Sequence, residues 1–324
     1  MKAMRASAAA IPFAKVAQCP LCERRPHLFV DRSEIEEELR MRDAFFAQRF
    51  ARHFSNAELV DVTSAIVATP ADILRCAICG ILVRDQAPDD DAFRDDRYED
   101  RVLESLYATH AAAFRAKERD YRSLLPEGSR IVEIGSYVGG FLTAAREWGW
   151  IATGVDIGTH PTRFSRALGF DARCLRFEDA NFERASLDAV FIWNCFEQLA
   201  DPGRLLVEVR RVLRPFGILV IRVPDADFYV QGREAMRTDR TALARLAYNE
   251  LLGWGFRFGF DLAALRRLAE HHQFALDRVL HRPVIRPLRT AMHSWAQAEE
   301  SALIAEGASA WMELMFRKRH DRVA

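Results

Sequence analysis

Four of the six cysteines are spaced so that they could bind one metal ion together. They form two C-x-x-C pairs, Cys19 with Cys22 and Cys76 with Cys79. Each such turn presents two thiolates from one tight loop, and two turns complete the tetrahedral set that structural Zn²⁺ prefers. About 50 residues separate the pairs, against about 15–20 in a simple ribbon, so we predict an insertion within a zinc ribbon. Four unmetallated thiols are the alternative. A redox pair is disfavoured, because neither pair opens a helix after a strand.

A glycine-rich loop, Gly135–Gly140, follows the apolar run Ile131–Ile134. Glycines let a backbone approach a ligand closely, and the helix that begins after them offers unpaired N–H groups. Asp156, about 20 residues beyond the loop, has the position of an acid that accepts hydrogen bonds from ribose hydroxyls. Tyr137 stands where a pyrophosphate would require glycine, which argues against NAD. The loop therefore predicts a site for another adenosine ligand.

Strands and helices alternate with short connections around this loop, as in an open sheet covered on both faces. The predicted strands are 130–135, 150–156, 170–175, 187–193 and 217–223, and the predicted helices are 139–148, 161–168 and 201–213. The last helix begins with the N-cap and first-turn pair Asp201-Pro202. The fold class is α/β: a doubly wound, mostly parallel Rossmann-like sheet with an N-terminal zinc-ribbon-like module and a helical insertion after strand five.

The flanking segments complete two expected domains, a zinc module over 1–97 and a main domain over 98–324. Within the module, Ser33 and Glu36 form a capping box ahead of a helix. The main domain opens with a helix over about 98–122 and contains an insertion or lid over about 225–260. The remaining expected elements are a helix over 261–271, a strand over 274–280, a helical stretch over 287–305 and a strand over 311–316.

Residues 130–223 resemble a class I S-adenosylmethionine-dependent methyltransferase. The resemblance rests on Val132-Glu-Ile-Gly-Ser-Tyr-Val-Gly-Gly140, Asp156, Trp193-Asn-Cys-Phe-Glu-Gln198 and Arg211-Val-Leu-Arg-Pro-Phe-Gly217. With the four cysteines and the insertion after strand five, the layout is similar to a bacterial group that includes sugar C-methyltransferases. The chain departs from that pattern at Gln198, where the family has histidine, and at Tyr137, where it has glycine.

The resemblance implies a set of residues for S-adenosylmethionine. They are Glu133, Gly135, Tyr137, Gly139, Gly140, Asp156, Ile157, Phe177, Glu178 and Asn194. Asp156 would hold the ribose, Ile157 the adenine face, the segment 177–179 the adenine edge, and Asn194 the amino-acid part. Tyr107 or His110 could also reach the mouth of this site.

Methyl transfer needs the acceptor held in line and does not always need a catalytic side chain. An acceptor that must lose a proton needs a base, and Glu197 and Asp225 are the best placed candidates, ahead of Tyr229, His271 and His272. Trp254, Phe256, Arg257 and Phe258 in the insertion offer an aromatic and cationic wall that could select the acceptor.

The bulk properties narrow the functional class. Lys plus Arg and Asp plus Glu are both 46, so no global field favours nucleic acid as a partner. No run is long enough to span a bilayer, and the N-terminus lacks a secretory core, which predicts a cytoplasmic protein without membrane contact. We therefore expect an S-adenosylmethionine-dependent methyltransferase with a small-molecule substrate, structural zinc and an oligomeric state that the sequence does not define. The alternative is a non-catalytic cofactor-binding protein whose zinc module recognises a partner. A nucleotide-dependent oxidoreductase is a third and less favoured alternative.

Overall fold

The computed structural model gives the placement of most of the chain. It describes residues 13–49, 69, 71–88, 92, 94, 98–238, 243–248, 250–253, 256–280 and 309–319. The predicted helix over 287–305 and the predicted wall residue Trp254 lie outside the described residues.

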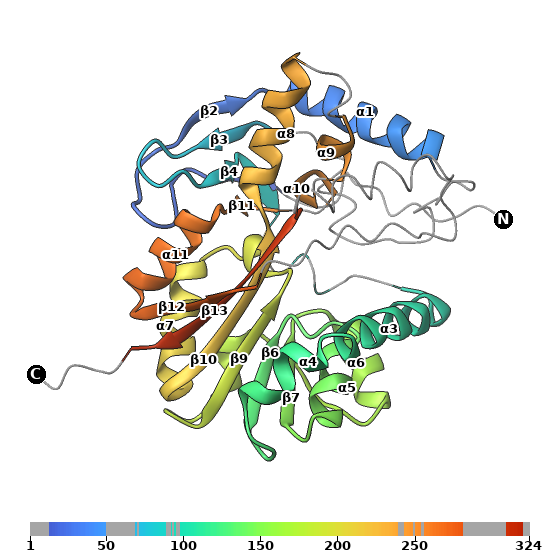
Figure 1. Cartoon of the computed structure of the whole chain (residues 1–324), viewed down its shortest axis with the longest axis vertical. Coiled ribbons are helices and arrows are strands. Elements are labelled where there is room, and N and C mark those ends of the chain that lie inside the picture. Colours follow the sequence, from blue (N-terminus) through green and yellow to red (C-terminus); the bar gives the residue numbers. More distant parts are fainter. Residues whose placement is uncertain are drawn as a thin grey trace, which may run out of the picture.

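A seven-stranded sheet forms the centre of the molecule, in the order β12-β13-β10-β9-β6-β7-β8 (Figure 1). The strands are β6 (Arg130–Ile134), β7 (Ile151–Asp156), β8 (Asp171–Cys174), β9 (Leu187–Trp193), β10 (Leu213–Pro224), β12 (Phe274–Val279) and β13 (Trp311–Lys318). The pairs from β8 through β10 are parallel, and β13 is antiparallel to both of its neighbours. The predicted mixed α/β fold with a large, mostly parallel sheet is confirmed.

Helices cover both faces of this sheet because its central strands alternate apolar side chains between two cores. On β9, Val190 and Ile192 pack with residues of α7 (Pro202–Val212) and α11 (Leu262–His271). Phe191 and Trp193 point the other way, into a cluster with residues of α4 (Glu118–Tyr121) and α5 (Gly140–Glu147). α3 (Asp100–Arg115) and α6 (Thr159–Ala167) complete this half of the molecule (Figure 1). As predicted, Asp201 caps α7, since its side chain accepts a hydrogen bond from the Arg204 N–H at 2.8 Å.

A smaller sheet, ordered β11-β4-β3-β2, lies beyond one end of the large sheet (Figure 1). β2 (His27–Val30), β3 (Ile73–Arg75) and β4 (Leu82–Arg84) come from the N-terminal region, whereas β11 (Phe258–Gly259) lies between β10 and β12 in the chain. A separate pair joins β1 (Phe13–Lys15) to β5 (Gln86–Pro88). The small sheet therefore unites segments that are far apart in the sequence.

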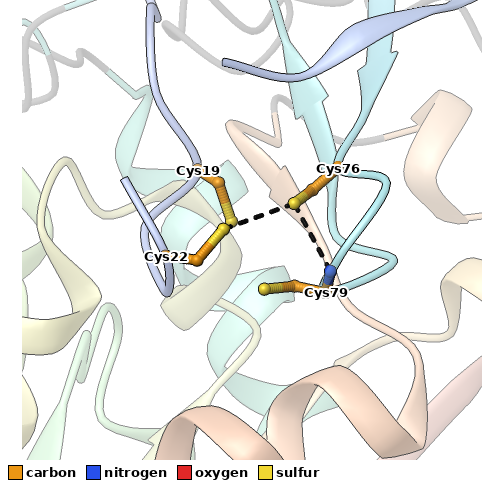
Figure 2. A group of neighbouring side chains, drawn as sticks. All are labelled: Cys19, Cys22, Cys76 and Cys79. Atoms are coloured by element: carbon orange, nitrogen blue, oxygen red, sulfur yellow. Dashed lines mark hydrogen bonds between the residues drawn. The ribbon is translucent and has the colours of Figure 1, made fainter. Parts of the chain in front are cut away.

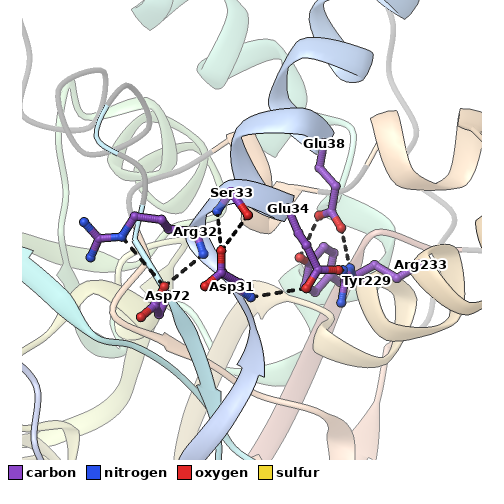
Figure 3. Close-up of polar contacts among 8 residues, drawn as sticks. All are labelled: Asp31, Arg32, Ser33, Glu34, Glu38, Asp72, Tyr229 and Arg233. Carbon is purple, nitrogen blue, oxygen red and sulfur yellow. Dashed lines mark hydrogen bonds and ion pairs between the residues drawn. The ribbon is translucent and has the colours of Figure 1, made fainter.

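The helix predicted within the N-terminal region is α1 (Arg32–Arg49), but its predicted capping box is wrong by two residues. Asp31 is the cap: its Oδ1 accepts the Ser33 N–H at 2.8 Å, and Glu34 Oε1 accepts the Asp31 N–H at 3.4 Å (Figure 3). Asp31 and Glu34 have the same spacing as Ser33 and Glu36, and the earlier pair caps because the strand β2 ends at Val30.

Between β10 and β11, the described residues form the helices α8 (Ala226–Thr238), α9 (Leu243–Ala247) and α10 (Glu250–Gly253). A buried polar network ties α8 to α1 (Figure 3). Tyr229 donates a hydrogen bond to Glu38 Oε2 at 2.8 Å, and Arg233 contacts both Glu38 and Glu34, the latter at 2.6 Å. Glu38 and Tyr229 are buried, so this network joins the N-terminal region to the segment after β10 through charges removed from water.

Within the described part of the chain, no helix is long and apolar enough to cross a membrane.

Candidate functional site

The glycine loop follows β6 and turns through two left-handed residues that fit glycine. Gly135 has φ 73°, and a Cβ atom there would lie 2.6 Å from the Sγ of Cys195. Gly139, at φ 78°, would place a Cβ atom 2.6 Å from the Ser165 hydroxyl. Both approaches are far below van der Waals contact, so the loop can lie this close to its neighbours only without side chains at these positions.

Asp156, at the end of β7, holds this loop in place. Its Oδ2 accepts the Tyr137 N–H at 2.8 Å, and its Oδ1 accepts the Gly158 N–H at 2.7 Å. A carboxylate oxygen can accept more than one hydrogen bond, so each oxygen keeps capacity for a ligand hydroxyl. The predicted relation between the glycine loop and Asp156 is therefore present in the fold.

Aromatic side chains surround the outer part of the loop. Tyr137 occupies the left-handed region at φ 45°, a conformation that is rare for a residue with a side chain. Its ring lies 5.6 Å from that of Tyr98 and 6.0 Å from that of His110. Tyr107 instead bonds to the Thr143 hydroxyl at 3.0 Å. Of the two α3 residues predicted near this mouth, His110 contacts the loop residue and Tyr107 packs on α5.

The turn after β9 brings a third set of residues to the same edge of the sheet. Asn194 adopts φ 57°, its main-chain N–H bonds to the Arg222 carbonyl at 3.0 Å, and its Oδ1 has no partner among the described residues. Cys195 donates to the Ile134 carbonyl at 3.3 Å. Glu197 is fully buried, and its Oε2 also has no partner within the described part of the chain. Buried polar atoms left in this way are uncommon and mark places where a ligand can bind.

Burial changes the acidity of the carboxyl groups at this edge. It raises the pKa of Glu197 to about 7, against the lowering effects of a backbone hydrogen bond, Gln198 and Arg222. It also raises the pKa of Glu133 well above its ordinary range, and the nearby Asp156 adds to that effect. The pKa of Asp156 is raised by burial, although the Gly158 and Tyr137 N–H groups oppose this. A carboxyl group near pKa 7 can exchange a proton at physiological pH.

Asp225, the second predicted base, also forms a hydrogen bond that stabilises the start of a helix. Its Oδ1 accepts the Asp227 N–H at 2.9 Å, which caps the start of α8. Burial raises the pKa of Asp225 to about 6, and the Asp227 and Asp261 carboxylates add to the increase.

The other residues predicted for the cofactor or the acceptor differ in burial and position. Ile157 and Glu178 are half-buried near the ends of β7 and β8, whereas the Phe177 ring lies in the core, 5.6 Å from Phe182. Phe256 and Phe258 are buried in the core, and Tyr229 belongs to the network with Glu38.

Two residues at this edge were missed from the sequence. Cys195 lies against Gly135, and Arg222 lies beside Trp193 in the strand register and 4.5 Å from the Trp311 ring. Arg222 also lowers the pKa of His110, although burial of the imidazole is the larger cause. The signal for Arg222 was present, because it is a lone charge within the apolar run Ile218–Val223.

The four predicted metal ligands lie close together beside the small sheet (Figure 2). Cys19 and Cys22 come from the segment before β2, and Cys76 and Cys79 come from the turn between β3 and β4. Their sulfur atoms all lie within 4.8 Å of one another, and no disulfide joins them. Cys22 Sγ lies 3.5 Å from Cys76 Sγ, and Cys76 Sγ accepts the Cys79 N–H at 3.4 Å. Burial opposes ionisation of Cys76, but the Cys79 and Ile78 N–H groups lower its pKa to about 7. Four thiols at this spacing fit a tetrahedral four-thiolate site.

Comparison with known families agrees with the geometry of the sheet edge. A family model described as a methyltransferase domain matches residues 107–279, which includes the glycine loop, Asp156 and Glu197. The chain belongs to this methyltransferase family. It is an S-adenosylmethionine-dependent methyltransferase, and this membership favours an enzyme over the non-catalytic alternative.

Several solved structures are similar to this methyltransferase at low identity. One is a possible histamine N-methyltransferase from Thermotoga maritima, with 20% identity over 68% of this chain and 95% of that chain and a TM-score of 0.47. Another is a putative methyltransferase in complex with the Trm112 activator of Haloferax volcanii, with 18% identity over 67% and 98% and a TM-score of 0.48. A third is geranyl diphosphate C-methyltransferase from Streptomyces coelicolor, with 14% identity over 64% and 76% and a TM-score of 0.44. No curated protein matches the sequence.

Proposed function

We propose that this methyltransferase acts on a small-molecule acceptor, a secondary metabolite or a sugar derivative, as the likeness of its motifs to sugar C-methyltransferases indicates. The observation that carries the proposal is the convergence of three features at the carboxyl edge of the sheet. The Gly135–Gly140 loop, the Asp156 carboxylate and the turn from Asn194 to Glu197 all lie where open α/β sheets bind ligands.

The residues at this edge fit an adenosine joined to an amino acid. Asp156 has acceptor capacity for the ribose hydroxyls, and Asn194 Oδ1 is an acceptor without a partner among the described residues. Buried Glu133 lies at the base of the loop. We assign the cofactor to Glu133, Gly135, Tyr137, Gly139, Gly140, Asp156, Ile157, Phe177, Glu178 and Asn194. For Phe177 we propose a main-chain contact at the adenine edge, because its ring lies in the core.

When bound, the cofactor supplies a methyl carbon on sulfonium sulfur, and the carbon–sulfur electron pair remains on sulfur as the new bond to the acceptor forms. The protein holds the acceptor atom in line with that bond, which supplies much of the rate. We assign the acceptor's proton to Glu197 Oε2, because this oxygen is unpartnered within the described residues and its pKa of about 7 suits proton uptake near neutral pH. Asp225, with a pKa of about 6, is the second candidate, although it also caps α8.

We assign the four-cysteine cluster to structural Zn²⁺, because all four ligand positions are filled by cysteine and none is left open for chemistry. We further propose a zinc module over 1–97, a methyltransferase domain over 98–324 and acceptor selection by 225–260. We also propose a cytoplasmic location, because two C-x-x-C pairs that converge on one point suit a metal site better than a disulfide framework.

Isothermal titration of the metal-replete protein with S-adenosylmethionine and S-adenosylhomocysteine tests the cofactor assignment. One site per chain is expected for each. The absence of heat with both ligands, from folded protein, would contradict it.

A further inference from the structure

The backbone of one residue, Arg257, links the four-cysteine hairpin to the Glu197 turn. The Arg257 carbonyl accepts the N–H of Arg84, on β4, at 3.0 Å. The Arg257 N–H donates to the Glu197 carbonyl at 2.8 Å. The guanidinium of Arg257 also donates to the Pro88 carbonyl, on β5. Arg257 therefore contacts both the N-terminal strands and the edge of the main sheet.

The cysteine cluster determines where β4 lies. Cys76 and Cys79 form the turn between β3 and β4, which is closed by Cys76 N–H to Ile81 O and Gly80 N–H to Cys76 O, both at 2.9 Å. β4 then pairs with β11 through Val83 with Phe258 and Leu82 with Gly259. We therefore expect a shift of the hairpin to displace β11, because the two strands are paired.

A continuous core reinforces this connection. Cys19, Cys76, Cys79, Ile81 and Val83 belong to the same buried cluster as Phe196, Phe258 and Phe260. The Phe196 and Phe260 rings lie 5.6 Å apart, directly beside the Glu197 turn. The cysteines and the turn after β9 are thus two parts of one hydrophobic core, without a solvent layer between two independent modules.

The cofactor loop touches the Glu197 turn where Gly135 lies against Cys195, but its other supports are different. Tyr137 N–H bonds to Asp156, Gly139 lies against Ser165, and Gly140 lies against His110 of α3. None of these contacts involves the cysteine hairpin or β11. Disturbance of the hairpin should therefore affect the turn that carries Glu197 more than the loop that carries the cofactor.

We infer that the metal-bound cysteine cluster fixes the position of the turn that carries Glu197, on the acceptor side of the site. Arg257 is the positioning residue, because its backbone bonds connect the cysteine hairpin to that turn. The inference rests on the proposed function, because that function gives Glu197 its place beside the acceptor. The metal site would then order the Glu197 turn specifically, in addition to stabilising the fold as a whole.

Hydrogen exchange measured by mass spectrometry tests this in the full-length protein, with zinc bound and after chelation. Chelation should accelerate exchange in peptides covering 194–199 and 256–260 by about tenfold, while peptides covering 132–142 stay unchanged. S-adenosylhomocysteine should bind both forms with affinities within about threefold of each other, because Asn194 is the one residue of its proposed set that lies in the peptides over 194–199 and 256–260. Unchanged exchange over 194–199 would overturn the inference, as would a parallel loss of S-adenosylhomocysteine binding, since the metal would then support the whole fold.

Two substitutions at one position isolate the Arg257 N–H. Arg257→Pro removes this donor, whereas Arg257→Ala keeps it and removes the guanidinium with its contact to Pro88. In zinc-loaded protein, Arg257→Pro should accelerate exchange over 194–199 and retain its metal, measured by zinc release to a chromogenic chelator. Equal exchange in the two variants would contradict the assignment. Titration with S-adenosylhomocysteine shows independently whether each variant is folded, and its failure with the unsubstituted zinc-loaded protein would count against the proposed function instead.

Discussion

The main-chain N–H of Arg257 donates a hydrogen bond to the carbonyl of Glu197 at 2.8 Å. This bond joins the residue just before β11, a strand of the small sheet, to the turn that follows the central strand β9. Glu197 itself is fully buried, with a pKa raised to about 7. A candidate proton acceptor in the main sheet is therefore held in part by strands of the N-terminal region.

Asp156→Ala should weaken binding of S-adenosylhomocysteine by about 10–100-fold, the usual loss when hydrogen bonds to a charged group are removed. The carboxylate also fixes the Tyr137 N–H, so part of the effect would come from a looser glycine loop. Calorimetric titration measures the affinity. Asp171→Ala, at an exposed carboxylate that starts the next strand, is the matched control and should bind normally. Equal affinities in the two variants would remove Asp156 from the site.

Glu197→Gln should change the pH dependence of stability in a defined direction. Burial raises the folded-state pKa of Glu197 from 4.5 to about 7, so the folded protein binds the extra proton between these values and loses stability as pH rises through them. Glutamine does not titrate. The variant should therefore gain stability relative to the unsubstituted protein between pH 5 and pH 8, by up to about 3 kcal/mol. Urea unfolding at the two pH values measures this, with Glu183→Gln, at an exposed position, as the control. A difference independent of pH would show that Glu197 keeps one protonation state.

Glu197→Gln should also reduce methyl transfer to an acceptor that must lose a proton, by about 10²–10⁴-fold, while S-adenosylhomocysteine affinity stays unchanged. In the unsubstituted protein, the rate should rise with pH through about 7, because the base must be ionised. A variant with full activity and the same pH profile would show that Glu197 is not the base. The rate would then come from positioning of the acceptor alone, or Asp225 would be the base.

Arg233→Met should destabilise the fold by about 3–5 kcal/mol, because it leaves the buried Glu38 carboxylate without its cation. Glu38→Gln with Arg233→Met should cost less than the sum of the two single changes, since the double variant leaves no unpaired buried charge. Urea unfolding of the four proteins gives the coupling. Additive effects would indicate that the network does not tie α1 to α8.

Local signals predicted much of the main domain. The apolar run of β9 and the Asp201-Pro202 start of α7 are signals that extend over a few residues, so both elements were identified from the sequence. The C-x-x-C pairs were visible for the same reason. The capping box failed because Asp31-Glu34 and Ser33-Glu36 satisfy the same pattern, and only the end of β2 decides between them.

Contacts between segments that are far apart in the sequence could not be predicted from such local signals. β11 contains only Phe258 and Gly259, too few residues for any periodicity, and it pairs with a strand more than a hundred residues earlier in the chain. The sequence indicated Arg257 as part of an acceptor wall, but gave no sign of its contacts to Arg84, Glu197 and Pro88. Cys195 carried no signal, because its role depends on the missing side chain at Gly135.

The most direct test of the account is transfer of a labelled methyl group from S-adenosylmethionine to an extract separated into small-molecule and macromolecular fractions. The zinc-loaded protein should place label in the small-molecule fraction, and Asp156→Ala should place little or none there. Label found only in the macromolecular fraction, or equal labelling by the two proteins, would contradict a small-molecule methyltransferase with its cofactor at Asp156.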